Sequence, residues 1–222
     1  MIEHDPDAQR MIDWCESIRP PATAEDMARE IIWVILCAGR SAQAARTIEK
    51  KVLLAIEAGE PVVSVFGYRA KAAAIERAWR DRDRDFQSLA TVIADSNELL
   101  RWCRAIPFIG DDTMYQLAKN FGANALKPDV WISRLTGFPD QPRAPVRVRY
   151  PACMALATML SEATGDSIPV VDSLMWLACN KGILVTDAHA RPVTFNPKFL
   201  TARSIYDSAD DAAAGAVVAE QT

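Results

Sequence analysis

The chain has 222 residues, half of them hydrophobic, which is enough to bury one sizeable core or two small lobes. Its net charge of −4 at pH 7 excludes strong nonspecific attraction to a polyanion, so any nucleic-acid surface must be local. The five cysteines include no C-x-x-C pair, which excludes a zinc knuckle and a compact iron–sulfur loop.

The amino-terminal residues have neither the basic flank nor the apolar stretch of a signal peptide. The longest apolar run, residues 31–38, is far shorter than the roughly 20 residues that cross a bilayer. We therefore expect a soluble, cytoplasmic protein with no membrane partner, and the sequence indicates no protein partner.

Apolar residues recur at helical spacing through most of the chain while alternating runs are nearly absent, so the predicted fold class is all-α. A first helix is predicted from Thr23, whose hydroxyl can cap it, to Cys37, with Gly39 as its stop. A second is predicted over residues 41–58, closed by Gly59. Further helices are predicted at residues 69–81, 86–94, 97–105, 112–121, 130–136, 151–164 and 168–180.

Two segments differ from this helical pattern. Residues 138–149 place three prolines among arginines, which predicts a surface loop. From Ser208 onward the chain is rich in Ala and Asp and has almost no large apolar residue, which predicts a disordered tail over residues 206–222.

Clusters of basic residues are candidates for a local nucleic-acid surface. Because such clusters are more often solvated faces, charge alone does not choose among them. The clusters are Arg40 with Arg46, Lys50 and Lys51; Arg77 with Arg80, Arg82 and Arg84; and Arg143 with Arg147 and Arg149.

The residues that indicate a function lie between two of the predicted helices and just after the second. Residues 106–113 read Ile-Pro-Phe-Ile-Gly-Asp-Asp-Thr, in which Pro107 stops one helix and Gly110 permits a tight reversal before the next. That is the pattern of a helix-hairpin-helix. One helix later, residues 127–135 read Lys-Pro-Asp-Val-Trp-Ile-Ser-Arg-Leu.

Together the two segments resemble the HhH-GPD superfamily of DNA glycosylases, whose hairpin reads L-P-G-[IV]-G-x-x-T and is followed by a helix and D-x-x-[IV]-x-R. The resemblance implies two helical lobes flanking a cleft that receives an extruded base, with Asp129 as the catalytic carboxylate. It divides the chain into a helical barrel lobe at 22–126, with the hairpin near 97–121, and a second lobe made of 1–21 plus 127–205.

The resemblance also implies the contacts that the site would make. A hairpin that ends at a helix N-terminus offers backbone N–H groups to a phosphate oxygen or a bridging cation. Asp129 would then lie near the sugar, where a carboxylate stabilises an oxocarbenium-like charge or activates water. The implied DNA contacts are Phe108, Ile109, Gly110, Thr113 and Lys127, and the implied base pocket is Tyr115, Trp131 and Gln43. No cofactor is expected beyond a monovalent or divalent cation that the hairpin could hold, and no metal ligands are predicted.

Several residues depart from the family pattern. Phe108 replaces the first hairpin glycine, and Asp112 stands where bifunctional glycosylases carry a lysine nucleophile, which disfavours lyase chemistry. Asp111 and Asp112 would repel DNA unless a cation bridges them to phosphate or they cap the following helix. Asp129 itself has the alternative role of N-cap for a helix beginning near Val130.

Three functions remain open at this point. The first is a monofunctional DNA N-glycosylase acting on a damaged or modified base. The second is an amino acid or amine:DNA transferase that displaces pyrophosphate from a pyrophosphorylated hydroxymethyl-thymine-type base, because residues 115–120 and 127–129 resemble the divergent branch of phage thymine-hypermodification proteins. The third is a noncatalytic DNA-binding module that kept the hairpin.

Overall fold

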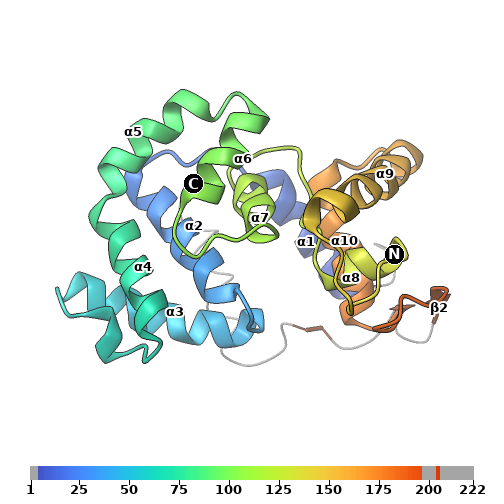
Figure 1. Ribbon diagram of the computed structural model, residues 1–222, viewed down its shortest axis with the longest axis horizontal. Coiled ribbons are helices and arrows are strands. Elements are labelled where there is room, and N and C mark those ends of the chain that lie inside the picture. The colour runs from blue at the N-terminus through green and yellow to red at the C-terminus, as the bar shows by residue number, and fades with distance from the viewer. Residues whose placement is uncertain (1–4, 197–203, 206–222) are drawn as a thin grey trace. The chain divides into compact units, whose positions relative to one another are not determined.

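The computed structural model describes residues 5–196 and 204–205 (Figure 1). Over those residues the chain is helical apart from one two-stranded sheet, which confirms the all-α class. The tail expected at 206–222 lies outside the described residues. The elements are α1 (Pro6–Ser17), α2 (Ala24–Cys37), α3 (Ala42–Glu57), the 3-10 turn η2 (Val62–Ser64), α4 (Arg69–Arg80), α5 (Arg82–Val92), α6 (Ser96–Ala105), α7 (Thr113–Asn120), α8 (Val130–Leu135), α9 (Val146–Thr164), α10 (Ile168–Asn180), β1 (Leu184–Val185) and β2 (Thr194–Phe195).

The chain divides into two compact units. Unit 1 combines Met1–Ser17 with Pro128–Thr222, and unit 2 is the continuous segment Ile18–Lys127. Unit 2 therefore contains the hairpin between α6 and α7, whereas unit 1 contains Asp129.

Helix α2 is the centre of unit 2, where it packs against α3, α4, α5 and α7. Thr23 caps it through a capping box with Asp26, as its hydroxyl accepts from the Asp26 N–H at 3.0 Å. Its core-facing apolar residues, including Ile31 and Ile35, are fully buried, and each such side chain contributes about 1.5–3 kcal/mol by leaving water. The predicted helix over residues 23–37 is thus confirmed, and its amphipathic face forms the core.

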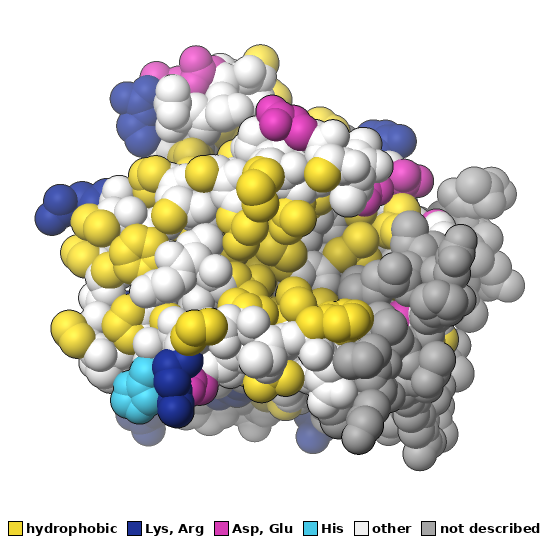
Figure 2. Space-filling view, turned by 90° about the vertical axis from the view of Figure 1, so that its right-hand side faces the viewer, with side chains coloured by type: hydrophobic (Ala, Val, Ile, Leu, Met, Phe, Trp, Pro, Cys, Tyr) yellow, Lys and Arg dark blue, Asp and Glu magenta, His cyan; other side chains and the backbone are white. Residues whose placement is uncertain are grey.

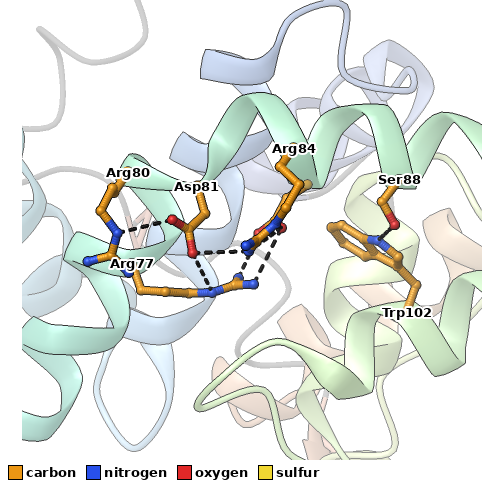
Figure 3. Close-up of polar contacts among 7 residues, drawn as sticks. Arg77, Arg80, Asp81, Arg84, Ser88 and Trp102 are labelled. Carbon is orange, nitrogen blue, oxygen red and sulfur yellow. Dashed lines mark hydrogen bonds and ion pairs between the residues drawn. The ribbon is translucent and has the colours of Figure 1, made fainter.

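The arginines that join α4 to α5 are held by carboxylates, as Figure 3 shows. Arg77 binds Asp85 at 2.6 Å and Asp81 at 3.3 Å, and Arg84 binds Asp81 at 3.0 Å. Trp102 of α6 donates its indole N–H to Ser88 of α5 at 3.0 Å. This candidate basic cluster is therefore largely neutralised by its own acids, so it offers little net attraction to a polyanion.

Unit 1 is built from segments far apart in the sequence. Helix α1 packs on α10, where the Cys15 thiol lies 3.1 Å from the Ser173 hydroxyl. Next to them, the buried ammonium of Lys181 lies 2.8 Å from Asp5 and 2.7 Å from Asp7. Helices α8 and α9 pack on the same α10 and on each other.

Part of the sequence prediction for unit 1 is wrong. Residues 138–149 were predicted as a surface loop, but α9 begins at Val146, and Arg149 is buried rather than part of a basic surface cluster. Pro151, predicted to open this helix, is its sixth residue, so one backbone hydrogen bond is lost there. The burial of Arg149 explains why the helix nevertheless extends past the proline, because tertiary contacts override local propensity.

Other elements were not anticipated from the sequence. These are α1, the short pair β1 and β2, and the first turn of α5, which begins at Arg82 instead of Phe86. Within the described residues, no helix is long and apolar enough to cross a membrane.

One face of the molecule is rich in exposed hydrophobic side chains, with charged side chains mostly at its margins (Figure 2). In unit 1 the large hydrophobic side chains that remain exposed include Val148, Met159, Val185, Val193 and Phe195. The small apolar interior of this unit therefore leaves part of its hydrophobic surface in contact with solvent.

Candidate functional site

The predicted hairpin is present in unit 2 as a tight turn between α6 and α7. The Ile109 N–H donates to the Ile106 carbonyl at 3.0 Å, which closes a four-residue turn with Pro107 and Phe108 at its centre. Phe108 has φ 66°, so the turn is of type II, the kind that places proline second and needs a positive φ in the third position. Phe108 thus adopts the conformation that glycine supplies in the family pattern.

Gly110 and Thr113 form the start of α7. The Thr113 hydroxyl accepts from the Gly110 N–H at 2.7 Å, and the Met114 N–H donates to the Gly110 carbonyl at 2.9 Å. A Cβ at Gly110 would meet one atom, the Thr113 hydroxyl at 3.9 Å, which is ordinary contact. The surrounding fold therefore leaves open space over this glycine.

Arg104 of α6 crosses the hairpin and neutralises one of its acids. Its guanidinium lies 2.6 Å from the Asp111 carboxylate and donates to the Ile109 carbonyl at 3.2 Å. Asp112 occupies the N-cap position of α7, yet its side chain makes no capping hydrogen bond. The capping explanation for Asp112 is therefore not supported by its geometry, and the charge of Asp111 is compensated.

Asp129 lies in unit 1, directly before α8, and caps that helix. Its Oδ1 accepts from the Trp131 N–H at 2.9 Å and the Ile132 N–H at 3.1 Å. The carboxylate is half-buried, and two backbone bonds fix its orientation. Asp129 is therefore the N-cap of α8. This role is compatible with catalysis, because a carboxylate that caps a helix is also held in one orientation.

Behind Asp129, the buried Arg149 ties its segment together. The guanidinium donates to the Pro128 carbonyl, to the Ser133 hydroxyl at 2.9 Å and to the Ala144 carbonyl at 3.2 Å. Pro128 precedes Asp129 and Ser133 lies on α8, so one side chain holds both ends of the capped turn. The sequence analysis placed Arg149 in a basic surface cluster, so its role as an internal tie was not predicted.

Burial and the charge of Asp129 both raise the pKa of two buried thiols, Cys179 and Cys153. Burial, together with the charge of the neighbouring Asp129 carboxylate, raises the pKa of Cys179 to about 12. Burial also raises the pKa of Cys153, while the hydrogen bond with Thr136 lowers it. Both thiols therefore stay protonated at neutral pH and serve as packing, as expected for free cysteines without a metal.

Trp131 and Arg134 lie on α8 beside Asp129. The Arg134 guanidinium stacks 5.0 Å from the centre of the Trp131 ring and donates to Asp140 at 2.9 Å. The indole is half-buried. The arginine of the D-x-x-[IV]-x-R pattern therefore orients Trp131 and joins α8 to the following loop.

The other predicted pocket residues lie in unit 2. Tyr115 is buried on α7, and burial raises the pKa of its phenol, as do the charges of Asp111 and Asp112. Gln43 is exposed in the first turn of α3, and the half-buried Lys127 lies near Cys37, since its charge lowers the pKa of that thiol. Tyr115, Gln43 and Lys127 thus share a unit with the hairpin, and Trp131 shares one with Asp129.

A polar chain between α2 and α7 was not foreseen from the sequence. Gln116 donates to Asn120 at 2.6 Å, and Asn120 donates in turn to the Glu30 carboxylate. The pKa of Glu30 is raised to about 7, because burial and the charge of nearby Glu49 outweigh the lowering effect of the bond from Asn120. A carboxyl that titrates near neutrality can exchange protons with a substrate. A glutamate within the apolar run of α2 was the available signal.

No family model, curated protein or solved structure matches this chain. Within the described residues, no group of three His, Cys, Asp or Glu side chains is arranged to hold a metal ion.

Proposed function

We propose that this protein is a DNA base-processing enzyme, a monofunctional N-glycosylase that flips a nucleotide and hydrolyses the bond between a damaged or modified base and its sugar. The observation that carries the proposal is the α6–turn–α7 hairpin, in which Gly110 lies under open space at the start of α7. A helix N-terminus of this kind binds a phosphate through backbone N–H groups and the helix dipole. Phosphate contacts position a strand without reading its sequence.

Asp129 supplies the chemistry in this proposal. A carboxylate held rigidly by the Trp131 and Ile132 N–H groups needs little reorganisation when positive charge develops on the sugar. It then stabilises that charge or takes a proton from the attacking water. The base leaves with the electron pair of the broken C–N bond, and water supplies the new C–O bond. Arg149 acts through Asp129 as a positioning residue, because it fixes Pro128 and Ser133.

The test replaces Asp129→Asn, which keeps the shape and capping capacity of the side chain but removes its charge. We expect single-turnover release of base to fall by about a hundredfold or more, the scale of losing a general base. Release is measured by mass spectrometry from duplexes that each carry one damaged or modified base, with DNA affinity measured at one fixed salt concentration.

Asp95→Asn is the matched control. Asp95 caps α6 in the same manner, accepting from the Asn97 and Glu98 N–H groups at 2.8 and 2.9 Å, but lies outside the proposed site. Its replacement should leave base release unchanged. If the Asp129→Asn variant releases the base as fast as the wild type does, Asp129 is rejected as the catalytic residue and is only a helix cap.

A second candidate is the amine:DNA transferase, and Glu30 is the observation that favours it. An amine nitrogen would attack the methylene carbon of a pyrophosphorylated hydroxymethyl base, and pyrophosphate would leave with the electron pair of the C–O bond. The ammonium proton would pass to Glu30, whose pKa of about 7 suits a general base.

This alternative has a distinct product. Incubation of DNA bearing the pyrophosphorylated base with free amines would give an enlarged nucleoside instead of a released base. The rate should rise through pH of about 7 as Glu30 ionises, and Glu30→Gln should abolish that rise. Neither a released base nor an enlarged nucleoside would favour a noncatalytic DNA-binding module.

A further inference from the structure

We propose that Tyr68 and Phe108, an exposed aromatic pair of unit 2 (the aromatic pair below), form a stacking platform for an unstacked nucleobase of DNA. The rings lie with their centroids 6.1 Å apart at an interplanar angle of 85°, one edge against the other face. Tyr68 comes from the residue before α4 and Phe108 from the hairpin turn, so two separate segments of the chain meet at this pair.

Exposure of the aromatic pair is the first argument. Tyr68 is 52% exposed and Phe108 is 41% exposed. Burying either ring in the core would be favourable, because more apolar surface would leave water. Val63 and Val65, which precede Tyr68, are 42% and 38% exposed. Large apolar side chains gathered at one place on a surface usually mark a binding site, whereas single exposed ones do not.

The conformation of Phe108 is the second argument. A bulky residue at φ 66° is strained, because its Cβ crowds the carbonyl oxygen, and glycine would occupy this turn position without that cost. The strained backbone keeps an exposed phenyl ring on the turn next to Tyr68, where a glycine would present no side chain. The ring therefore contributes something that the fold alone does not require.

Charge around the aromatic pair selects the partner. Arg40 lies over the ring of Phe66 at 5.1 Å, and Arg69 follows Tyr68 directly as the first residue of α4. Burial lowers the pKa of Lys71, and the nearby positive charge of Arg40 lowers it further. The buried ammonium of Lys71 donates to the Ile35 and Ala38 carbonyls at 2.8 and 2.7 Å, so Arg40 and Arg69 are the cations left at the surface.

These cations contrast with the arginines between α4 and α5. Among residues 5–196 and 204–205, no carboxylate forms an ion pair with the exposed Arg40 or Arg69, whereas Arg77 and Arg84 are paired. Uncompensated positive charge next to exposed aromatic rings matches a polyanion whose bases are open to stacking. Single-stranded or locally unstacked nucleic acid has both properties.

Helix ends add to this arrangement. Tyr68 is the N-cap residue of α4, and Phe108 lies four residues before Asp112, the N-cap residue of α7; neither cap makes a side-chain hydrogen bond to its helix. The positive end of one helix dipole therefore lies at Tyr68 and that of another follows Phe108 along the chain, and both favour phosphates.

The inference rests on the proposed function and sharpens it, because it names the part of the DNA that unit 2 contacts. The hairpin would touch the strand through a side chain as well as through its backbone. Stacking on a π-face tolerates any base, so the aromatic pair would recognise an unstacked base and not a particular sequence.

The experiment uses the full chain with two short duplexes of one sequence, one fully paired and one carrying 2-aminopurine opposite an abasic site. We compare Tyr68→Leu, which removes the ring but keeps an apolar side chain, with Tyr68→Phe, which keeps the ring. Phe108→Gly tests the second ring without straining the turn. Leu54→Ala is the control, since Leu54 is 65% exposed in the same unit and lies on α3.

Wild-type protein should bind the 2-aminopurine duplex more tightly than the paired one and change its fluorescence on binding. Tyr68→Leu and Phe108→Gly should each weaken that binding by about tenfold, the scale of losing one stacked base, and reduce the fluorescence change. Tyr68→Phe and Leu54→Ala should behave like the wild type.

Unchanged affinity and fluorescence in Tyr68→Leu would overturn the inference, as would equal binding of the two duplexes or no DNA binding. Base release, measured on the same samples, separates this result from the proposed function. Tyr68-dependent binding without release of any base would leave the platform in place and remove the glycosylase. Base release that is unaffected by Tyr68→Leu would leave the glycosylase in place and remove the platform.

Discussion

The two units differ in how much apolar side chain surrounds their buried charges. In unit 2 the core is a continuous apolar cluster in which α2 packs against its neighbours, and Lys71, Asp85 and Lys119 are buried beside it. In unit 1 the apolar cluster around Ile12 and Val170 is small, and the interior also holds the charged groups of Asp5, Asp7, Lys181 and Arg149.

This difference matters because the two kinds of interior fail in different ways. Apolar contacts are tolerant of direction, so unit 2 can lose a methyl group and adjust. Buried charges need their partners at hydrogen-bonding distance, so removing one leaves the others uncompensated in a low-dielectric interior. Unit 1 also carries Asp129, whose orientation depends on directional bonds of the same type.

The largest expected effect is therefore on unit 1. Lys181→Met removes the cation that lies 2.8 Å from Asp5 and 2.7 Å from Asp7. Leaving two carboxylates buried should lower the free energy of unfolding by about 3–5 kcal/mol. Hydrogen exchange read by mass spectrometry should show the lost protection in α1 and α10, with unit 2 unaffected.

The triple variant Asp5→Asn, Asp7→Asn, Lys181→Met is the control for this prediction. It removes all the charges together, so it should recover much of the stability that Lys181→Met loses. A Lys181→Met protein as stable as the wild type would show that the three groups are not held in the interior.

The next prediction concerns the apolar core of unit 2. Ile35→Ala opens a cavity in the core of unit 2, where Ile35 is fully buried, and should cost about 2–5 kcal/mol. Leu54→Ala, at an exposed position on α3, should stay within about 0.5 kcal/mol of the wild type. Chemical denaturation followed by hydrogen exchange in each unit checks both values; equal losses from the two variants would contradict the described core.

Acid should affect the units in opposite directions. The folded pKa of Glu30, about 7, is above its ordinary 4.5, so unit 2 has this contribution in full below 4.5 and loses it as pH rises through 7. Burial raises the pKa of Asp7, but bonds from Lys181, Ser204 and Ile205 lower it below its ordinary 3.8. Unit 1 has that contribution above 3.8 and loses it as pH falls through the lower folded value.

Glu30→Gln isolates the first of these effects. It should raise the stability of unit 2 by about 1–3 kcal/mol near pH 8 and change it little near pH 4, because the neutral amide carries no buried charge. Denaturation of both proteins across this pH range is the measurement. A wild-type stability of unit 2 that rises between pH 5 and about 8 in step with the variant would contradict the raised pKa of Glu30.

The smallest effect concerns the hairpin. Phe108→Gly relieves the positive φ of the turn but loses the edge contact with Tyr68 and gives the unfolded chain more freedom. The net change should be a gain of up to about 1 kcal/mol in the free energy of unfolding, visible as a higher melting temperature. A clear loss of stability would mean that the Phe108 ring supports the fold.

Sequence patterns predicted most of the helices of unit 2, because their stops are local. Thr23 and Ser41 cap α2 and α3 through their own hydroxyls, and Gly39 and Gly59 follow these helices with φ of 77° and 70°. The start of α9 could not be predicted, because Pro151 has the local signature of a first turn and the burial of Arg149 depends on contacts with Pro128 and Ser133.

The candidate site was predictable only in part for the same reason. The hairpin and Asp129 have local signatures, and the structure gives Asp129 the cap position that its spacing allowed. Tyr68 has none, and Glu30 has only its place within an apolar run, since the significance of each comes from a partner far along the chain, Phe108 and Asn120 respectively. Pairings of this kind depend on tertiary packing and cannot be read from periodicity.

The discontinuous make-up of unit 1 also orders events on the ribosome. Helix α1 is synthesised before unit 2, yet Cys15 meets Pro169 and Ser173 of α10, more than 150 residues later. All of unit 2 leaves the exit tunnel in between, and as a continuous segment it can fold while α1 still waits. The apolar face of α1 must therefore avoid non-native contacts until α10 emerges. Unit 2 has no such requirement, because it is one continuous segment.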